Sequence, residues 1–446
     1  MIHRFEVKNF RSILDLGVAF TYDEGKAPPK DDMVETLPFL EDSKGRRVSR
    51  VVPVLSIYGA NASGKSNLVR AFQIFQRILS FGIVGAYQPN KLNHGRDKSI
   101  FRVEVLLSDG KYATYEIGYN GQRIVEERLS WRDCHLGEGS NERTLFCMSG
   151  EGGGDNEKAS YCSAEFLGLE TAEYSAKRFR EAIRIECSDP DGNQVRPFFW
   201  CLVRSFSGLS PLVVNVWKEV FERLHVFSMN SFFISEGIDR LAGADTDEAR
   251  QKALDKIGVL LQKFDFGIKN LSLLRQKMQE EPTDNALMGA ICCRRGREVI
   301  VDQITSRHLD VNGEVVPFNF MLEESDGTKV IAGILGICLW ALETGRTVVI
   351  DELDRSLHPF VLVSLVKLFK SRRYNVANGQ LIFTLHDPTL LGEEMMRVSE
   401  VAIINKTLKE GSTCRRLSDY KGVRNINNFR KQYLAGVYSG IPFPYI

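Results

Sequence analysis

Eight residues near position 60 have the types and spacing that bind phosphate. The run Gly59–Ser66 fits the pattern G-x-x-x-x-G-K-[ST], in which glycines let backbone N–H groups point at phosphate oxygens. Lys65 is expected to reach the β- and γ-phosphates, and the Ser66 hydroxyl to bind Mg²⁺. A helix that follows would add its positive N-terminal end. The predicted nucleotide-binding residues here are Gly59, Asn61, Ala62, Ser63, Gly64, Lys65, Ser66 and Asn67.

Two carboxylates end a short apolar run in the last third of the chain. Thr347–Ile350 has the composition of a buried strand, and Asp351 and Glu352 follow it. At the carboxyl end of a parallel strand, Asp351 would lie beside the phosphate loop and hold Mg²⁺, directly or through water. Glu352 would be placed to polarise the attacking water. Solvated acids at strand ends are common, so this prediction depends on the phosphate loop in the same chain.

Two further sites are predicted only because of their position relative to the other motifs. Ser325 and Gly327 precede the helix that leads into the acidic strand, where a hydroxyl and a helix-end amide could meet phosphate. Alone, this pattern is an ordinary helix N-cap. His386 follows the apolar run Leu381–Leu385 and could face the γ-phosphate, although a lone histidine there would be read as a helix cap. The predicted catalytic residues are Glu352, Lys65 and His386.

The elements around these residues have suitable periodicity. A buried strand at Val51–Tyr58 is predicted before the phosphate loop, and an amphipathic helix after it. In the last third, strands at Thr347–Ile350, Leu381–Leu385 and Val401–Asn405 alternate with helices, which are predicted at about Thr328–Leu342 and Phe360–Phe369. Short apolar strands that alternate with helices are typical of a parallel α/β sheet.

The chain is predicted to form one head that is interrupted by an insertion. Alternating apolar residues at 2–20 and 99–132 predict antiparallel strands. A glycine-rich, acidic stretch at 149–158 marks a change in composition and is expected to be a surface loop, and helical patterns prevail from there to residue 300. We expect a β-rich N-terminal part with the phosphate loop (1–148), a mainly helical insertion for partner or oligomer contacts (149–300) and a C-terminal part (301–446).

Composition excludes several classes of protein. Lys and Arg total 58 and Asp and Glu total 57, so a net charge of +1 gives no electrostatic argument for a dedicated nucleic-acid binder. Nine cysteines without a CxxC pair favour reduced thiols in a cytoplasmic protein. The longest apolar stretch, Val330–Leu342, spans about 13 residues, which is too short to cross a bilayer. We expect no membrane partner, and DNA is possible but not indicated by charge.

The order of these motifs resembles the ABC-type ATPase heads of the SMC and RecF group. It resembles more closely the stand-alone AAA15 family of ATPases, which is related to the nucleotide-binding half of OLD proteins. The resemblance covers the first and last thirds of the chain. It rests on Asn9–Ser12, Gly59–Asn67, Glu324–Lys329, Asp351–Pro359, Gln380–Asp387 and Tyr433–Phe443.

The resemblance implies an ABC-type P-loop ATPase head, with a mixed β lobe and a parallel α/β lobe, that uses ATP and Mg²⁺. Two heads would dimerise face to face, with each ATP held between one chain's phosphate loop and the partner's signature. Here the signature is the segment Ser325–Thr328, so that Ser325, Gly327 and Thr328 would contact nucleotide. Arg11 and Ser12 would lie near adenine and ribose.

The sequence departs from the ABC-head pattern in two places. Arg355–His358 would form the loop that crosses to the other subunit, but it ends in His358 where related heads carry Asp. A residue for the glutamine loop is not identifiable, and Gln88 is a weak candidate. The positioning of water and the contacts between subunits are therefore open.

Three functions share such a head. The favoured one is an ATPase that forms a homodimer or higher homo-oligomer, senses a trigger and controls a separate effector, because chains of this build resemble the ATPase half of anti-phage systems that are often paired with a nuclease-like partner. The alternative is a RecF-like DNA-repair ATPase. A third is an ATP-gated binding module that hydrolyses little. A transporter subunit is disfavoured by the spacing of its motifs. Ser325 lies 266 positions after Gly59, whereas the signature of transporter subunits follows the phosphate loop much more closely.

Overall fold

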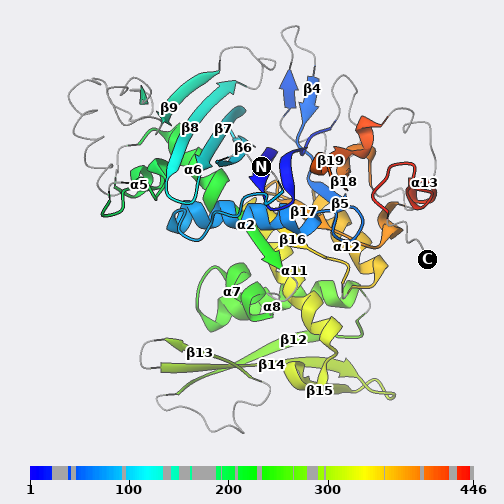
Figure 1. Ribbon diagram of the computed structural model, residues 1–446. Coiled ribbons are helices and arrows are strands. Elements are labelled where there is room, and N and C mark those ends of the chain that lie inside the picture. Colours follow the sequence, from blue (N-terminus) through cyan, green and yellow to red (C-terminus); the bar gives the residue numbers. More distant parts are fainter. Residues whose placement is uncertain are drawn as a thin grey trace.

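The computed structural model (Figure 1) places most of the chain, and the description below concerns those parts alone. The predicted surface loop at 149–158 lies outside them, except for residue 149. The residues described are 1–22, 39–41, 47–92, 97–133, 142–149, 161–162, 187–191, 193–205, 209–228, 234–264, 266–278, 290–295, 298–355, 357–391, 396–420 and 429–441.

One sheet of thirteen strands runs through the head, in the order β10-β9-β8-β7-β6-β1-β2-β19-β18-β5-β17-β16-β11. One half, from β10 to β19, is antiparallel, and the other half, from β18 to β11, is parallel. The antiparallel strands are β1 (Ile2–Phe10), β2 (Ile13–Ala19), β6 (Ser99–Leu106), β7 (Lys111–Tyr119), β8 (Ile124–Asp133), β9 (Arg143–Ser149), β10 (Tyr161–Cys162) and β19 (Gly411–Arg416). The parallel strands are β5 (Val54–Tyr58), β11 (Leu224–Ser228), β16 (Thr347–Asp351), β17 (Gln380–Thr384) and β18 (Val401–Thr407).

Helices cover both faces of the parallel half, as the alternation of its side chains requires. Val349 of β16 belongs to the same hydrophobic cluster as the buried side of α2 (Lys65–Phe81), while its neighbours Val348 and Ile350 belong to a second cluster. Successive strand residues point to opposite faces of a sheet. The second cluster contains α11 (Asp326–Thr344) and α12 (Pro359–Lys370), so these helices lie on the face opposite α2.

The predicted α/β fold, with a mixed β lobe and a parallel α/β lobe, is therefore confirmed. Each strand and helix predicted in the last third is present to within two residues at its ends. Helix α11 is the one described helix that is long and apolar enough to cross a membrane, but 72% of its most apolar window is buried in this fold. Its apolar character is explained by packing beneath the sheet.

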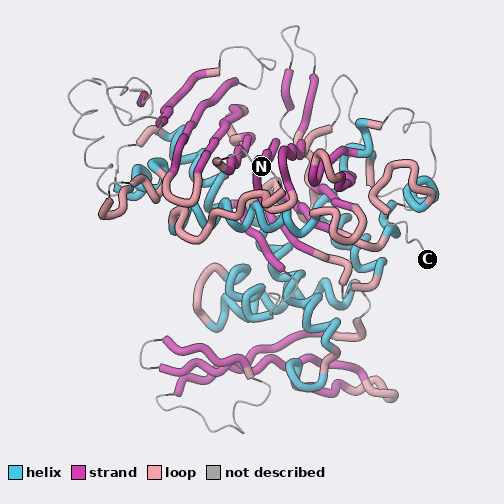
Figure 2. Tube along the Cα trace, in the orientation of Figure 1, coloured by secondary structure: helices cyan, strands magenta, loops and turns pink. Residues whose placement is uncertain are grey.

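A smaller lobe lies below the main sheet in Figures 1 and 2 and consists of two helices on an antiparallel sheet. Buried charge joins the two layers, because Asp302 of the sheet accepts from Arg250 of one helix at 2.8 Å and from Arg275 at 2.7 Å. We call this unit the accessory lobe. Its elements are α7 (Ile234–Ala242), α8 (Asp247–Lys263), β12 (Asn270–Met278), β13 (Ile291–Arg295), β14 (Glu298–Leu309) and β15 (Val315–Asn319).

The accessory lobe packs tightly on the head through helices α7 and α11. A Cβ atom on Gly336 of α11 would lie 2.7 Å from the Cα of Gly237 of α7. Only glycine at both positions lets the two backbones approach this closely. The lobe therefore meets the head along the helix that carries the predicted signature at its N-terminal end.

The division of the chain differs from the expected one. Segment 149–300 contains helices, as predicted, but β11 within it is a parallel strand of the main sheet that pairs with β16. Strands β12 and β13 also lie in this segment, and the sheet that they form continues to residue 319. The short run at β11 is flanked by helical patterns, and its partner strand lies more than 100 residues away, so local periodicity did not reveal it.

The remaining elements belong to neither of these two sheets. They are β3 (Phe39–Glu41), β4 (Arg47–Arg50), α5 (Phe198–Ser205), α6 (Pro211–Trp217), the π-helix η2 (Lys218–Glu222), α10 (Phe320–Glu323), the 3₁₀ turns η4 (Pro388–Leu391), η5 (Val398–Glu400) and η6 (Leu417–Asp419), and α13 (Phe429–Leu434).

Candidate nucleotide-binding site

The phosphate loop connects the buried strand β5 to the N-terminus of α2. Its backbone takes positive φ at Gly59, Ala62 and Gly64. A Cβ on Gly59 would collide with the carbonyl oxygen of Ile404, and one on Gly64 with the Ser412 side chain. The two glycines are therefore required by shape as well as by backbone conformation. The N–H groups of the first turn of α2 begin directly after Gly64.

The amine of Lys65 lies inside the loop. Its side chain is 5% exposed, and Nζ donates to the carbonyl oxygens of Gly59 at 2.6 Å and Ala60 at 3.3 Å. Burial lowers the pKa of Lys65, and the charges of Asp351, Asp354 and Glu352 oppose that effect. The carboxylates of the acidic strand end are thus close enough to act on this amine.

Thr384, at the end of β17, fixes the acidic strand end. Its hydroxyl donates to Asp351 Oδ1 at 2.6 Å and accepts from the backbone N–H of Glu352 at 2.7 Å. Glu352 has a φ of 53°, in the left-handed region. Because β17 pairs with both β16 and β5, these strand ends meet beside the phosphate loop.

The predicted switch histidine lies beside Glu352. His386 Nε2 is 3.5 Å from Glu352 Oε1, and the other carboxylate oxygen, Oε2, is 3.7 Å from Arg355 Nη1. The backbone N–H groups of His386 and Asp387 both donate to Asp354 Oδ2 at 2.6 Å. Asp354 therefore holds the turn that carries His386 against the acidic strand end.

These residues line one cleft. It has a volume of about 560 Å³, and a second hollow of about 510 Å³ shares Glu352 and His386 with it. The structure brings together the phosphate loop, the acidic strand end and the histidine, which are spread over more than 300 residues of sequence. The residues that line the cleft are Ala60, Asn61, Ala62, Lys65, Glu352 and His386.

The predicted magnesium ligands fit a cation that keeps most of its coordination from phosphate and water. Among the described residues, no group of three or more His, Cys, Asp or Glu side chains could hold a metal ion. Ser66 is exposed in the first turn of α2, and Asp351 ends β16 at the same edge. Mg²⁺ prefers oxygen ligands and is commonly bound by one or two side chains together with substrate phosphates.

Ser12 lies against the phosphate loop. Its hydroxyl is 2.8 Å from Ser412 Oγ and accepts from Asn67 Nδ2 at 2.6 Å. Ser412 in turn donates to the carbonyl oxygen of Ser63 at 2.7 Å. Arg11 is exposed on the adjoining turn, and its backbone N–H donates to the carbonyl oxygen of Gln88 at 2.9 Å. The predicted contacts of Arg11 and Ser12 with adenine and ribose stay predictions.

The predicted signature lies elsewhere on the chain. Ser325 caps α11, and its hydroxyl accepts from the backbone N–H of Thr328 at 3.1 Å. None of the residues Ser325–Thr328 lines the cleft at the phosphate loop. Just before the cap, Glu324 Oε1 contacts Ser306 Oγ at 2.5 Å and His308 Nε2 at 2.6 Å, both on β14. The accessory lobe therefore holds the start of the signature helix.

Several supporting residues were missed from sequence. Thr384 and Asp354 stood inside recognised motifs, but neither had a role assigned to it. The role of Thr384 could have been suspected from the sequence, because it places a hydroxyl at the end of an apolar strand. Ser412 belongs to a hairpin with no motif, and it lies 349 residues from its partner Ser63, so nothing local marks it.

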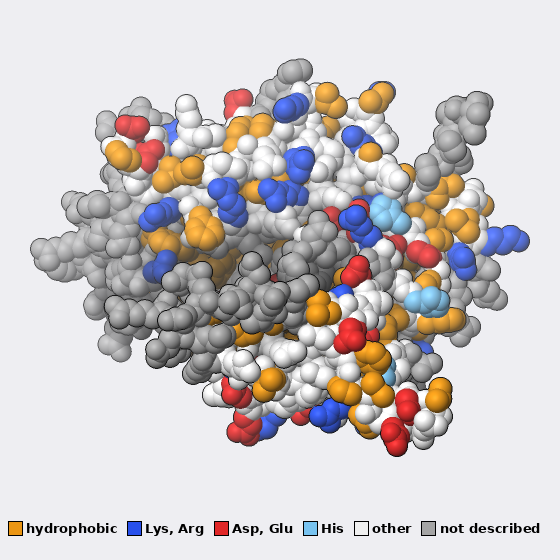
Figure 3. Space-filling model, turned by 90° about the horizontal axis from the view of Figure 1, so that it is seen from below, with side chains coloured by type: hydrophobic (Ala, Val, Ile, Leu, Met, Phe, Trp, Pro, Cys, Tyr) orange, Lys and Arg blue, Asp and Glu red, His pale blue; other side chains and the backbone are white. Residues whose placement is uncertain are grey.

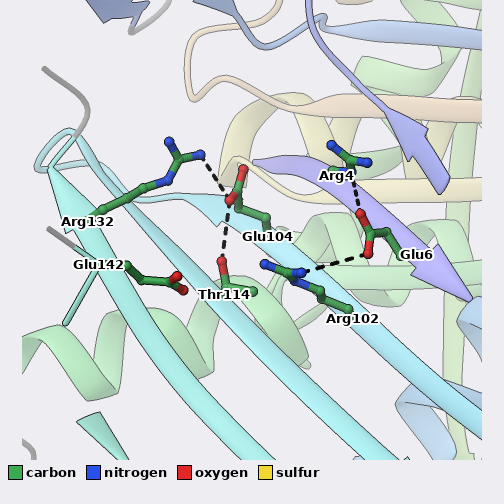
Figure 4. Close-up of a pocket in the computed structure, with 7 residues that line it drawn as sticks. All are labelled: Arg4, Glu6, Arg102, Glu104, Thr114, Arg132 and Glu142. Carbon is green, nitrogen blue, oxygen red and sulfur yellow. Dashed lines mark hydrogen bonds and ion pairs between the residues drawn. The ribbon is translucent and has the colours of Figure 1, made fainter. Parts of the chain in front are cut away.

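A separate polar cavity of about 280 Å³ lies on the antiparallel half of the sheet (Figure 4). Its charges pair within the cavity wall, because Arg132 binds Glu104 at 3.1 Å and Arg4 binds Glu6 at 2.6 Å. Burial opposes ionisation of Glu104, but hydrogen bonds and charge from His3 and Arg132 lower its pKa to about 2. Most of the charges that line this cavity are therefore already bound in ion pairs with each other.

Comparison with known proteins gives a partial family match. Residues 218–392 match a family model described as an AAA domain, putative AbiEii toxin, of a Type IV TA system. That range contains the acidic strand end and His386, and the phosphate loop precedes it. No curated protein matches the chain.

Solved structures of SMC and RecF proteins are similar to the chain at low sequence identity. The SMC head domain from Thermotoga maritima is 12% identical over 93% of this chain and 98% of that one, with a TM-score of 0.36. An Smc head with a coiled coil and joint from Pyrococcus yayanosii is 10% identical over 98% and 99%, with a TM-score of 0.40. The recombination mediator RecF with ATPrS is 13% identical over 94% and 98%, with a TM-score of 0.34.

Proposed function

We propose that this chain is an ATPase that hydrolyses ATP in the cleft between the phosphate loop and the acidic strand end. One observation carries the proposal: Lys65, Glu352 and His386, which come from three separate motifs, line a single cleft. A magnesium ion bound by Ser66 and Asp351 would neutralise phosphate charge. Thr384 orients Asp351, and it also holds the backbone from which Glu352 projects.

Glu352 is the proposed base that orients the attacking water. Its carboxylate lies 3.5 Å from the imidazole of His386, which is exposed to the cleft and placed to contact the transferred phosphate. Lys65 would exchange its present carbonyl partners for phosphate oxygens. The backbone N–H groups of the phosphate loop and the N-terminus of α2 would bind the remaining charge.

We further propose that two chains assemble head to head, with each nucleotide between one phosphate loop and the partner's signature. The separation of Ser325–Thr328 from the cleft within one chain supports an arrangement in trans. Bound nucleotide would then hold the two heads together, and its removal would let them separate. We propose that this cycle controls a separate effector protein, in anti-phage defence.

The RecF-like alternative makes a different prediction. A DNA clamp needs many Lys and Arg contacts to phosphate, and its activity falls with salt. The face of the molecule in Figure 3 carries both acidic and basic side chains, with several basic ones gathered in its upper half. The net charge of +1 over the whole chain supports a protein partner over DNA. ATPase activity that rises with duplex DNA at low salt, and loses that rise at high salt, would instead favour the DNA-repair function.

The substitution Glu352→Gln tests the enzyme proposal. Turnover should fall by about 100-fold or more, because the water loses its base while the shape of the cleft is kept. Phosphate release is measured with Mg-ATP, and Glu343→Gln, an exposed acid on α11 paired with Lys256, is the matched control. Equal turnover in Glu352→Gln and wild type would remove Glu352 from the mechanism. A wild-type chain that binds ATP without turnover would be an ATP-gated binding module.

A further inference from the structure

Glu324, the residue before the signature segment Ser325–Thr328, binds the accessory lobe. Its side chain is only 11% exposed, although the next residue, Ser325, is exposed. One carboxylate oxygen, Oε1, accepts from Ser306 Oγ at 2.5 Å and lies 2.6 Å from His308 Nε2. None of these side chains lines the nucleotide cleft or takes part in the proposed reaction. Their contact therefore has another role.

Strand β14 presents both of these donors on one face. Ser306 and His308 are two residues apart, and alternate residues of a strand point to the same side. The imidazole of His308 meets the ring of Phe318 on the paired strand β15 edge to face, with the ring centroids 4.8 Å apart. A carboxylate oxygen only accepts, so Nε2 of His308 is the nitrogen that donates to Glu324. The strand pair thus aims a fixed donor at the start of α11.

The accessory lobe holds α11 at a second place as well. Asp302, also on β14, is 1% exposed and accepts from arginines of α8 and β12, which joins the layers of the lobe. The lobe in turn packs on α11 where Gly237 meets Gly336. Gly336 lies eleven residues after Ser325, which is about 16 Å along a helix. Because one lobe holds the helix at two separated points, the signature end of α11 is expected to move with the lobe.

We propose that His308 is a positioning residue for the signature, through which the accessory lobe controls hydrolysis in the partner chain. The proposal rests on the proposed head-to-head assembly. Glu324 adjoins Ser325, whose hydroxyl accepts from the backbone N–H of Thr328 at 3.1 Å in the first turn of α11. Groups that stabilise charge on a reacting phosphate must be held in a fixed geometry. A displaced Glu324 would therefore disturb the nucleotide of the other chain and leave the cleft of its own chain intact.

A second contact between the lobe and α11 supplies a matched control. Lys256 of α8 lies 2.8 Å from Glu343, near the C-terminal end of α11. Both side chains are substantially exposed, and ion pairs of this kind contribute little to stability. Lys256→Ala thus removes a contact between the same lobe and the same helix without touching the signature.

A mixture of two inactive chains tests the direction of the effect. Lys65→Ala disables a chain's own cleft, and Ser325→Arg disables the signature that a chain offers. A mixed dimer has one complete site, which combines the phosphate loop of the Ser325→Arg chain with the signature of the Lys65→Ala chain. Phosphate release from this mixture with Mg-ATP is the reference.

His308→Ala is then placed in one chain of the mixture at a time. In the Lys65→Ala chain it should lower turnover by about five- to tenfold, since this chain supplies the working signature. In the Ser325→Arg chain it should leave turnover unchanged, as should Lys256→Ala in the Lys65→Ala chain. His308→Gln in the Lys65→Ala chain keeps an N–H donor and should restore most of the turnover.

Hydrogen exchange separates this proposal from the proposed function. Without nucleotide, peptides that contain Ser325–Lys329 should exchange faster in His308→Ala than in wild type, and at the wild-type rate in Lys256→Ala. If the reference mixture is inactive, assembly in trans fails, and control of the partner chain fails with it. The exchange of Ser325–Lys329 still decides whether His308 holds the signature.

Equal losses of turnover with His308→Ala in either chain would overturn the proposal, because they would show a general loss of stability. Unchanged turnover together with unchanged exchange at Ser325–Lys329 would also overturn it. If His308→Ala does not fold, Ser306→Ala makes the same prediction, since it removes the other donor to Glu324 Oε1.

Discussion

The residues of the cleft differ in how well their roles could be predicted from their amino-acid types. Lys65 and Ser66 follow from a pattern in which each position has one physical task, and the acids at 351 and 352 follow from an apolar strand that ends in charge. Thr384 is as important for the geometry of the cleft, because its hydroxyl donates to Asp351 and accepts from the backbone N–H of Glu352. Threonine is common in strands, so its type alone gave no warning of this role.

Thr384→Val should therefore impair turnover more than stability. We expect kcat to fall by about tenfold or more, since Asp351 and Glu352 lose their common partner, with a loss of unfolding free energy of about 1 kcal/mol. Thr347→Val is a matched control on the same pair of strands, because Thr347 Oγ1 donates to Gln380 Oε1 at 3.1 Å at the opposite end. Steady-state kinetics and urea unfolding of both variants measure the difference. A comparable fall of kcat in both variants would contradict a local role for Thr384.

Elements were predicted well where one periodicity ran long enough to be unambiguous. Helix α11 and the strands β16 and β17 lie within two residues of their expected ends. Strand β11 and the accessory sheet were not foreseen, because their partners are distant and their burial depends on them. The sequence predicted the three motifs of the site. It did not predict the residues that connect these motifs, such as Asp354 and Ser412, because their hydrogen bonds join positions that only the folded chain brings together.

Glu127 ties helix α5 to the antiparallel half of the sheet. The side chain is 1% exposed, and it accepts from the backbone N–H of Phe198 at 2.7 Å and of Phe199 at 2.9 Å, at the start of α5. Burial raises the pKa of Glu127 to about 7, although hydrogen bonds from Phe199, Phe198, Tyr115 and Gln194 oppose that rise. In the folded state this carboxyl therefore keeps its proton until the pH approaches about 7.

The raised pKa predicts how stability depends on pH. The folded pKa of Glu127 lies above the ordinary value of 4.5, so its contribution to the free energy of unfolding is fully present below pH 4.5 and is lost as pH rises through about 7. The slope is at most about 1.4 kcal/mol per pH unit. Glu127→Gln, which keeps the shape without the charge, should remove this part of the slope. Urea unfolding of both proteins between pH 5 and 8 measures it, and parallel slopes would contradict the prediction.

At the scale of the whole molecule, the predicted signature does not line the cleft, so in the proposed head-to-head assembly a single chain would hold only a part of each site. The cleft holds the phosphate loop, while the signature lies at the far end of α11, where His308 and Ser306 of the accessory lobe bind Glu324. In the proposed assembly, a displacement of β14 at this contact would act on the residues next to a partner's nucleotide. This makes the lobe a suitable place for a trigger to act.

Complementation tests assembly in trans. Lys65→Ala should abolish nucleotide binding in its own cleft, and Ser325→Arg should spoil the signature that it offers to a partner. Each variant alone should lack activity, whereas a mixture should regain a part of wild-type turnover, because a mixed dimer contains one intact composite site. Phosphate release from the mixture measures this, and size-exclusion chromatography with Mg-ATP reports assembly. A mixture as inactive as its components would argue against shared sites.

The pairing of the central strands has a consequence for the chain as it leaves the ribosome. Strand β5, which carries the phosphate loop, lies between β17 and β18, and more than 300 residues must be translated after it before either partner exists. At about 5–20 residues per second, this interval lasts from roughly 15 seconds to a minute. An unfinished or truncated product therefore lacks both the histidine turn and the neighbours that hold the loop. The proposed activity of the cleft would therefore appear only after β17 and β18 have been synthesised and paired with β5.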